Sequence, residues 1–525
     1  MRNEEGLPTV EVSGGRASPF EEDTRHALER AVLPAYLRGQ RWFGGKARQI
    51  ESVRFTDWGE LPAGSTWAFL TLLEVYFADG GRDLYCLPLA LSSGAAAERI
   101  VATLRSRALA RLTGHPGGAL LHDALADDAV CAALLGAIAE GSEIRLKAGR
   151  VRAFTTAAFP ALRGRVEDPL PVTRGPESSS NTLVLFGERL LLKVFRRLEA
   201  GTNPDFEVGR YLTEATDFDR IPKVAGAIEY HPPQGEHYTL AILQALVANQ
   251  GDGWRHALDE LSRYFERAAR GGVGPYLDAA ATLGRRTAEM HRALAAGKSD
   301  PAFAPEPMTA DDVAALAQDI LAQGRQALEG TRESLGRLPE SVAPAARQFL
   351  DEAPAVLRRW AEAPGVRPGA IKIRCHGDYH LGQVLWADDD FVILDFEGEP
   401  TRTIAERRAK QSPLKDVAGM LRSFDYAAYA GLFAFTQDRP DHFGRLAPEA
   451  ERWRQAVSAA FLDAYRATAA DLLPADAAQR AALLDAFLLA KALYELVYEL
   501  NNRPDWARIP LRGILALLEG GRGRG

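Results

Sequence analysis

Hydrophobic positions change their spacing along the chain, and each spacing predicts a different element. Residues 22–38 place apolar side chains at helical intervals. Val53–Trp58, Trp67–Phe77 and Leu84–Leu89 are rich in β-branched and aromatic residues, which predicts strands. The Ala-Asp-Gly-Gly sequence at 78–81 predicts a hairpin turn between the last two strands. Residues 92–140 are rich in Ala and Leu and predict helices.

Short strands are predicted again farther along the chain. They cover Val151–Thr155 and Thr182–Phe195, with a turn at Phe186–Arg189. After about residue 253 the pattern is almost wholly helical, except that 371–396 contains three apolar runs typical of short buried strands. These runs are Ile371–Cys375, Gln383–Trp386 and Phe391–Phe396. The order is a β-rich front, a small mixed lobe and a large α-rich lobe.

The composition narrows the class of partner. The 525 residues include 63 Lys and Arg against 70 Asp and Glu, a formal charge of −7. This balance favours neither nucleic acid nor an anionic membrane as a partner. No run of about 18 residues is apolar and uncharged, so no membrane span is expected. Three scattered cysteines and an N-terminus without an apolar signal segment favour a cytoplasmic enzyme acting on a small molecule.

The strongest chemical motif lies in and just after the segment 371–396, the part of the C-terminal half that is not predicted to be helical. His376-Gly-Asp-Tyr-His-Leu-Gly-Gln383 is followed twelve residues later by Asp395-Phe-Glu397. Phosphoryl transfer needs a carboxylate that orients the attacking hydroxyl and oxygen ligands for Mg²⁺. Asp378 fits the first requirement, and Gln383 with Asp395 fits the second.

Two other interpretations fit this motif when it is taken alone. Asp-Gly turns beside histidine are common, so Asp378 is as easily structural as catalytic. His376, Asp378 and His380 also form an H-x-D-x-H pattern that can hold Zn²⁺ in a hydrolase. The chain has ten histidines and no second His/Asp cluster, which makes the hydrolase the weaker hypothesis.

An upstream segment supports the phosphoryl-transfer interpretation. Gly175-Pro-Glu-Ser-Ser-Ser-Asn-Thr182 precedes a predicted strand, where backbone N–H groups and hydroxyls can cradle phosphate. Lys193 lies inside the apolar strand that follows, where an ammonium is costly unless it is paired. Glu207, at the start of a predicted helix, is the expected partner. A strand lysine that is held by a helix glutamate can bind the phosphates of a nucleotide.

A further set of polar residues follows one face of a predicted helix near the C-terminus. Lys491, Tyr494, Glu495 and Tyr498 are spaced at i, i+3, i+4 and i+7. The face is either solvated or lines a sugar site, to which Trp506 would add an aromatic ring. Asp416 is expected to cap a helix or to brace the catalytic loop, and His291 is expected to pack in a core.

The H-G-D-x(4)-Q…D-F-E arrangement resembles the catalytic and metal loops of the protein-kinase-like fold, in its aminoglycoside-phosphotransferase branch. Further stretches make the chain similar to the maltokinase family over nearly its whole length. They are Arg41–Lys46, Ser180–Thr182, Leu192–Leu198, His376–Gln383, Ile393–Pro400, Ser412–Ala427 and Lys491–Glu499. The turn Gly175–Thr182 is slightly longer than its counterpart in the family.

The resemblance implies an α+β, bilobal protein-kinase-like fold with an N-terminal cap subdomain and a large, mostly α-helical C-lobe. We expect a flexible tail over 1–22, the cap over 23–134, an N-lobe over 135–246 and the C-lobe over 247–525. The activity implied is ATP- and Mg²⁺-dependent phosphorylation of maltose to maltose 1-phosphate, in a pathway that makes trehalose synthase a partner. A glucosamine or other sugar kinase of the same fold is the main alternative, and a non-catalytic nucleotide-binding protein a remote one.

The resemblance also assigns roles to individual residues. Asp378 is the catalytic base. The expected nucleotide-binding residues are Ser179, Ser180, Asn181, Thr182, Lys193 and Glu207. The expected metal ligands are Gln383, Asp395 and Glu397. The expected sugar-binding residues are His376, Lys491, Tyr494, Glu495 and Tyr498.

Overall fold

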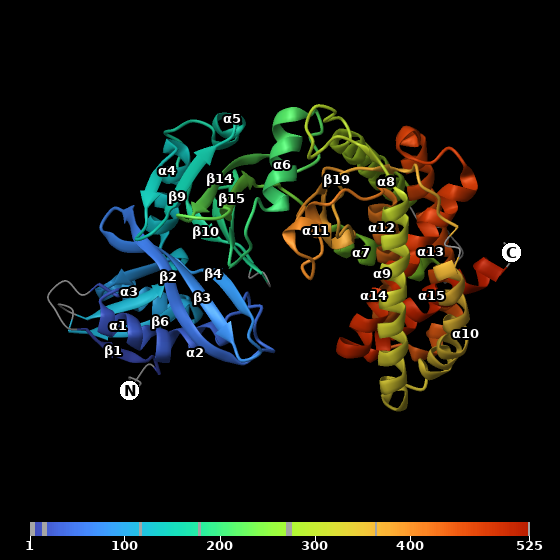
Figure 1. The fold of residues 1–525 in the computed structure, drawn as a ribbon, viewed down its shortest axis with the longest axis horizontal. Helices are drawn as coiled ribbons and strands as arrows, with labels where there is room; N and C mark the ends of the chain where they lie inside the picture. The colour runs from blue at the N-terminus through green and yellow to red at the C-terminus, as the bar shows by residue number, and fades with distance from the viewer. Residues whose placement is uncertain are drawn as a thin grey trace. The chain divides into compact units, whose positions relative to one another are not determined.

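The computed structural model describes residues 6–12, 18–114, 118–176, 180–268, 276–362 and 365–522. It divides into two compact units, which we describe separately (Figure 1). Unit 1 comprises Met1–Glu214 with Pro222–Ala248, and unit 2 comprises Ala215–Ile221 with Asn249–Gly525.

Unit 1 is built on two sheets. The first has the strand order β1-β6-β7-β5-β3-β4-β13, with β2 paired to β3. Its strands are β1 (Thr9–Glu11), β2 (Ile50–Ala63), β3 (Thr66–Phe77), β4 (Arg82–Cys86), β5 (Leu89–Ser92), β6 (Ala108–Thr113), β7 (Ala119–Asp123) and β13 (Arg197–Leu198). The second has the order β10-β11-β12-β15-β14-β9-β8. Its strands are β8 (Glu143–Arg145), β9 (Arg150–Thr155), β10 (Val172–Arg174), β11 (Asn181–Phe186), β12 (Leu190–Phe195), β14 (Val224–His231) and β15 (Tyr238–Ala245).

Helices cover these sheets because each presents one apolar face. A continuous helix consists of α1 (Glu22–Ala27), a π-helical turn (Leu28–Val32) and α2 (Leu33–Gly39). Its Leu33 and Leu37 are fully buried in the core of the first sheet. The remaining helices of unit 1 are α3 (Gly94–Thr103), α4 (Asp128–Glu140), α5 (Phe159–Arg163) and α6 (Pro204–Ala215). A single apolar cluster contains residues of both sheets and of α4, so the two sheets share a core.

Unit 2 is mostly helical. Its helices are α7 (Gly253–Ala268), α8 (Tyr276–Leu294), α9 (Ala310–Ser334), α10 (Ala343–Glu362), α11 (Ile404–Arg408), α12 (Leu414–Thr436), α13 (Phe443–Thr468), α14 (Ala477–Asn502) and α15 (Arg508–Arg522). Its short strands are β16 (Glu306–Pro307), β17 (Ile371–Lys372), β18 (Val384–Ala387) and β19 (Asp390–Ile393). Helix α12 is buried along most of its length and packs against α7, α13 and α14, so it forms the centre of the unit.

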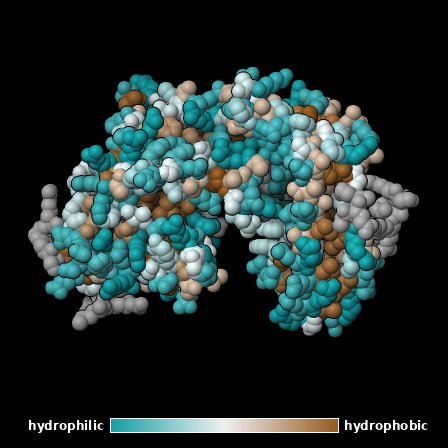
Figure 2. Space-filling model, viewed as in Figure 1, coloured by the Kyte–Doolittle hydropathy of each residue, from teal (hydrophilic) through white to brown (hydrophobic). Residues whose placement is uncertain are grey.

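The surface is mostly hydrophilic on the face of each unit that Figure 2 shows, as expected for a chain in which 25% of the residues are charged. None of the helices in the described ranges combines the length and the apolar character that a bilayer crossing requires.

The structure confirms many predicted elements and corrects others. The structure contains the predicted helix at 22–38, the β3–β4 and β11–β12 hairpins, and short strands within 371–396. The expected helical region 92–140 instead contains β6 and β7 between α3 and α4. Ala and Leu favour helices, but both strands are nearly buried inside the sheet, and this packing overrides the local preference. The β14–β15 hairpin was not predicted.

The flexible tail predicted for residues 1–22 is also corrected. Thr9–Glu11 pairs in parallel with Arg111–Thr113 as an edge strand of the first sheet. Val10 and Val12 are buried in that core, which the polar composition of the segment did not reveal.

A close contact between α8 and α13 gives a test of this packing. A Cβ atom on Gly284 would overlap the carbonyl oxygen of Phe461, so the helices would have to move apart. We expect Gly284→Ala to destabilise unit 2 by about 1–3 kcal/mol, seen as a lower midpoint of chemical unfolding. Gly444→Ala, in α13, is the control because a Cβ there has nothing within 4 Å. An unchanged midpoint for Gly284→Ala would show that the helices are not packed this closely.

Candidate active site

The predicted catalytic loop lies between β17 and β18 and is held by a buried carboxylate. Asp416, in the first turn of α12, accepts hydrogen bonds from the backbone N–H groups of His376 (2.8 Å) and Gly377 (2.9 Å). Gly377 has φ +90°, a conformation that favours glycine. Both atoms of the Asp416 carboxylate are therefore used to fix the backbone next to Asp378.

Asp416 is in turn held by buried groups of neighbouring helices. His291 Nε2 donates to Asp416 Oδ2 (3.0 Å), and His291 Nδ1 contacts the Tyr465 hydroxyl (2.8 Å). The side chains of His291 and Asp416 are fully buried. Burial raises the pKa of Asp416, but the hydrogen bond from His291 and the nearby imidazoles lower it more, so the carboxylate stays charged. The expectation that Asp416 braces the loop is met by this geometry, and His291 does more than pack.

His376 joins the catalytic loop to the predicted metal loop. Its Nε2 donates to the carbonyl oxygen of Leu394 (2.7 Å), and the residue is only 1% exposed. The sequence placed His376 in sugar binding. The structure shows that its ring braces the two loops, and a role in sugar binding stays a prediction.

Asp378 is paired with a lysine from a distant helix. Lys491 Nζ, on α14, lies 3.1 Å from Asp378 Oδ1 and 3.5 Å from Glu399 Oε1. Burial raises the pKa of Asp378, but the Lys491 ammonium, together with His380, lowers it below the usual aspartate value. For the base Lys491 burial acts in the other direction and lowers the pKa, but the carboxylates of Asp378 and Glu399 raise it by more. Asp378 is therefore an ionised carboxylate at neutral pH.

The predicted metal ligands Gln383 and Asp395 lie side by side. Gln383 Nε2 donates to Asp395 Oδ2 (3.1 Å). Asp395 has φ 65°, which is uncommon for a residue with a Cβ and often marks a functional position. An amide and a carboxylate, with Glu397 two residues on, form an oxygen-rich donor set that suits Mg²⁺ better than Zn²⁺.

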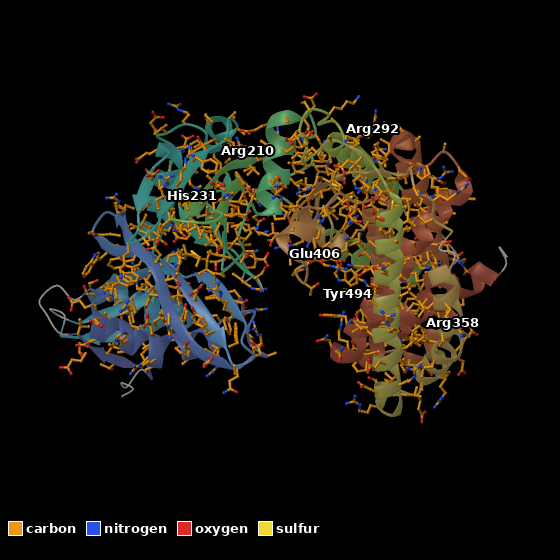
Figure 3. The ribbon with its side chains drawn as sticks, viewed as in Figure 1. Arg210, His231, Arg292, Arg358, Glu406 and Tyr494 are labelled. Carbon is orange, nitrogen blue, oxygen red and sulfur yellow. The ribbon has the colours of Figure 1, made fainter. Side chains whose placement is uncertain are left out.

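The polar face of α14 divides into exposed and buried residues. Tyr494, which Figure 3 labels, and Tyr498 are among the few large hydrophobic side chains of the described residues that are exposed. Their exposed fractions are 36% and 48%. Glu495 accepts two hydrogen bonds from the Arg422 guanidinium, from Nε (2.8 Å) and Nη2 (2.6 Å). Burial raises the pKa of Glu495, and the Arg422 guanidinium opposes this shift. This ion pair anchors α14 to α12 through one carboxylate oxygen of Glu495, and the binding of sugar by Glu495 stays a prediction.

Trp506 lies near this face but is partly covered. Its ring stacks on Tyr426 with centroids 6.2 Å apart, and the Arg503 guanidinium lies 4.5 Å above it. Tyr426 in turn donates to Glu499 (3.1 Å). These contacts hold Trp506 just beyond the end of α14, in the short 3-10 turn Pro504–Ala507.

In unit 1, Lys193 lies in the middle of the second sheet, on β12. Its Nζ lies 2.9 Å from Asp205 Oδ2, and both side chains are more than nine-tenths buried. Asn203 accepts a hydrogen bond from the Asp205 N–H (2.8 Å), which caps the first turn of α6. The sequence named Glu207 as the partner, and this bond adds Asp205, two residues earlier in the same turn, to the side chains beside Lys193. The pairing with Glu207 stays a prediction. The sequence could have indicated Asp205 as well, because Asp205 and Glu207 both follow Asn203-Pro204 at the start of the predicted helix.

The remaining predicted nucleotide-binding residues lie at the start of β11. Asn181 and Thr182 are buried and pair with Phe195 and Val194 of β12, and Ser180 directly precedes them. Ser179 lies outside the described residues.

Comparisons with known proteins show what this chain is similar to. Residues 36–127 match the family described as maltokinase N-terminal cap domain. The chain is 29% identical to a glucosamine kinase of Streptacidiphilus jiangxiensis over 65% of its length and 72% of that protein. It is 26% identical to a glucosamine kinase of Mycolicibacterium smegmatis (strain ATCC 700084 / mc(2)155) over 70% of its length and 84% of that protein.

Solved structures of a glucosamine kinase are also similar. A complex with glucosamine, ADP and inorganic phosphate aligns over 94% of this chain and 99% of that chain, at 25% identity and a TM-score of 0.61. A second crystal form aligns over 93% and 98%, at 26% identity and a TM-score of 0.62. The predicted fold class is confirmed: the chain has an α+β, bilobal kinase-like fold with an N-terminal cap domain and a helical C-lobe.

The pairing of Asp378 with Lys491 predicts a change in pH dependence. In the unaltered chain the ammonium keeps the pKa of Asp378 low, so an activity that needs this carboxylate should fall only at quite acidic pH. In Lys491→Met the ammonium is lost while burial remains, so the pKa rises and the acid limb of kcat/KM moves to higher pH.

Glu399→Gln is the matched control. It removes a contact of Lys491 but leaves the ammonium beside Asp378, so its acid limb should stay where it is in the unaltered chain. If the Lys491→Met profile coincided with the unaltered one, Lys491 would not set the charge state of Asp378.

Proposed function

We propose that this chain transfers the γ-phosphoryl group of ATP to a sugar, and that the acceptor is the anomeric hydroxyl of maltose. The observation that carries the proposal is the ionised Asp378, fixed by Asp416 and Lys491, with the Gln383–Asp395 pair on the next loop. The similarity to proteins named glucosamine kinase supports the same reaction class.

Asp378 would orient the sugar hydroxyl and accept its proton. The bond from the sugar oxygen to the γ-phosphorus forms as the bond to the β,γ-bridging oxygen breaks, ADP leaves and the proton goes to Asp378. A carboxylate of low pKa suffices because the hydroxyl acidifies as its bond to phosphorus forms. Positioning and charge stabilisation then supply most of the acceleration.

Other residues would hold the nucleotide and the ion. Lys193, paired with Asp205, would bind the phosphates of ATP, and Asn181 and Thr182 begin the strand beside it. Gln383, Asp395 and Glu397 would hold Mg²⁺, which neutralises phosphate charge when bound.

The exposed tyrosines favour a disaccharide as the acceptor. Tyr498 follows Lys491 by seven residues, about 10 Å along the helix axis, so the face of α14 continues beyond the sugar ring at Asp378. Aromatic rings offer a flat apolar surface to the C–H face of a second glucose ring. The match of residues 36–127 to the maltokinase cap supports the same choice.

Glucosamine is the second candidate. The similar proteins carry that name, and Asp378 with Glu399 places two carboxylates where the ammonium group of an amino sugar would be attracted. Lys491 already lies between these carboxylates, which makes the site less favourable for a second cation.

The role of Asp378 is tested by Asp378→Asn. We expect kcat to fall about 10²- to 10⁴-fold, because the amide cannot accept the proton. ATP affinity, measured by calorimetry, should change little because Asp378 does not contact the nucleotide in this mechanism. Retention of more than about a tenth of the rate would contradict the assignment.

The acceptor is tested with Mg·ATP and maltose, glucose, glucosamine and an aminoglycoside. We expect maltose to be phosphorylated with loss of its reducing end. Tyr498→Ala should raise KM for maltose about two- to tenfold, whereas Tyr498→Phe keeps the ring and should not. Phosphorylation of glucosamine but not of maltose would overturn the assignment of maltose and support the second candidate.

A further inference from the structure

The N-terminal cap contains a carboxylate that is buried between two arginines. Asp123, at the end of β7, lies 2.5 Å from Arg196 Nη2 and 2.9 Å from Arg107 Nη1. The side chains of Asp123 and Arg196 have no exposed surface. The N–H of Leu125 also donates to Asp123 Oδ1 (3.0 Å), so the carboxylate is fixed in one orientation. Leaving one member of a buried ion pair without its partner is strongly unfavourable, so this contact holds the chain rigidly.

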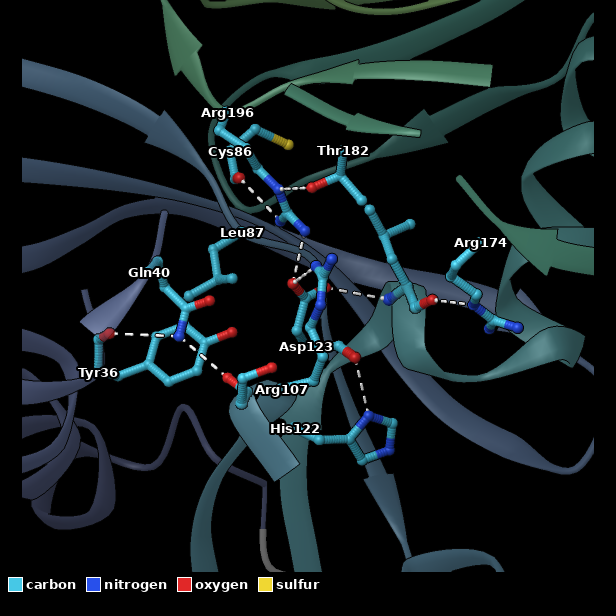
Figure 4. A network of polar contacts seen from close by, with 12 residues as sticks. Tyr36, Gln40, Cys86, Leu87, Arg107, His122, Asp123, Arg174, Thr182 and Arg196 are labelled. Carbon is cyan, nitrogen blue, oxygen red and sulfur yellow. Dashed lines mark hydrogen bonds and ion pairs between the residues drawn. The ribbon is translucent and has the colours of Figure 1, made fainter. Parts of the chain in front are cut away.

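Arg196 connects the cap to the strand that carries Lys193. It lies between β12 of the second sheet and β13 of the first, three residues after Lys193. Its Nη1 donates to the Cys86 carbonyl oxygen (3.4 Å), and its guanidinium lies 4.9 Å from the Trp42 ring. Its Nε donates to Thr182 Oγ1 (2.8 Å), as Figure 4 shows. The cap thus fixes the guanidinium, which in turn fixes the start of β11.

A second arginine ties the neighbouring strand to the same part of the cap. Arg174, the last residue of β10, donates from Nε to the Leu125 carbonyl oxygen (3.0 Å) and is paired with Asp128. Figure 4 draws Arg174 in the same network of contacts as Thr182, Arg196 and Asp123. The short segment Asp123–Asp128 therefore contacts β10 directly and β11 through Arg196.

We propose that the cap segment Asp123–Asp128 positions the β10–β11–β12 strands, and with them Thr182 and Lys193, for binding of ATP. This inference rests on the proposed function and gives the cap a role in nucleotide affinity. Thr182 pairs with Val194, and Leu183 pairs with Lys193, so a shift at the start of β11 is transmitted to the lysine. Asp123, Arg196 and Arg174 are positioning residues, because none of them is assigned a contact with substrate.

The test is Asp123→Asn, which keeps the shape of the side chain and removes its charge. Loss of a negative charge near the nucleotide site would by itself tighten ATP binding. Loss of positioning does the opposite, and we expect ATP to bind about tenfold more weakly by calorimetry. KM for ATP should rise in parallel, while KM for the sugar changes less than twofold.

Asp83→Asn is the matched control. Asp83 is also a mostly buried cap carboxylate between two arginines, Arg197 (3.0 Å) and Arg48 (3.6 Å). Arg197 is adjacent to Arg196 but is not bonded to Thr182, so ATP affinity should stay within twofold of the unaltered chain. A tenfold loss in Asp83→Asn as well would overturn the inference, because any cap–strand ion pair would then have the same effect.

Arg174→Lys is a second variant in case Asp123→Asn does not fold. It keeps the positive charge but cannot reproduce the two-acceptor geometry of the guanidinium, so ATP binding should weaken several-fold. If the unaltered chain binds ATP and both variants bind it equally well, the cap does not position the site and only this inference fails. If the unaltered chain does not bind ATP at all, the proposed function fails instead.

Discussion

The carboxylate of Asp416 is the constraint on which the candidate site of unit 2 depends. It occupies the first turn of α12, a helix that is buried along most of its length, and it accepts hydrogen bonds from two backbone N–H groups of the loop that carries Asp378. A charge in such a position is tolerated only if hydrogen bonds satisfy it completely, and His291 supplies a further bond. The loop backbone is therefore fixed by the core of the unit, and the Asp378 side chain is left to act on a ligand.

The sequence predicted candidate residues for the chemistry but not the side chains that hold them. Asp378, Gln383 and Asp395 were proposed because their residue types and spacing reflect what phosphoryl transfer requires, and the structure places Gln383 beside Asp395. Glu495 and His376 were assigned to the sugar, Glu495 from the spacing of polar residues on α14, and the structure adds contacts that the sequence did not predict, with Arg422 and with Leu394. These contacts join elements far apart in sequence, and no local pattern reveals them. Likewise, the bond from Lys193 to Asp205 depends on the direction of one side chain within the first turn of α6.

The fold shows the same division. Elements with a strong local pattern, such as the helix at 22–38 and the hairpins at 66–86 and 181–195, were predicted. Strands β6 and β7 were not, because their Ala and Leu residues are strand-forming only inside the first sheet. Arg196 and Asp123, which connect the two sheets, were unremarkable as sequence. Their importance comes from complete burial, which only the folded chain displays.

Lys491 reaches Asp378 across 113 residues of sequence. The group that sets the charge of the candidate base is thus on the same helix as Tyr494 and Tyr498, the side chains that would contact the rest of the acceptor. The basicity of Asp378 and the choice of acceptor are consequently linked through one helix, α14. A change of sugar that required α14 to shift or rotate would displace the ammonium together with the tyrosines, and it would alter the basicity of Asp378. Acceptor range in such a protein can widen easily only through changes that leave the axis of α14 in place.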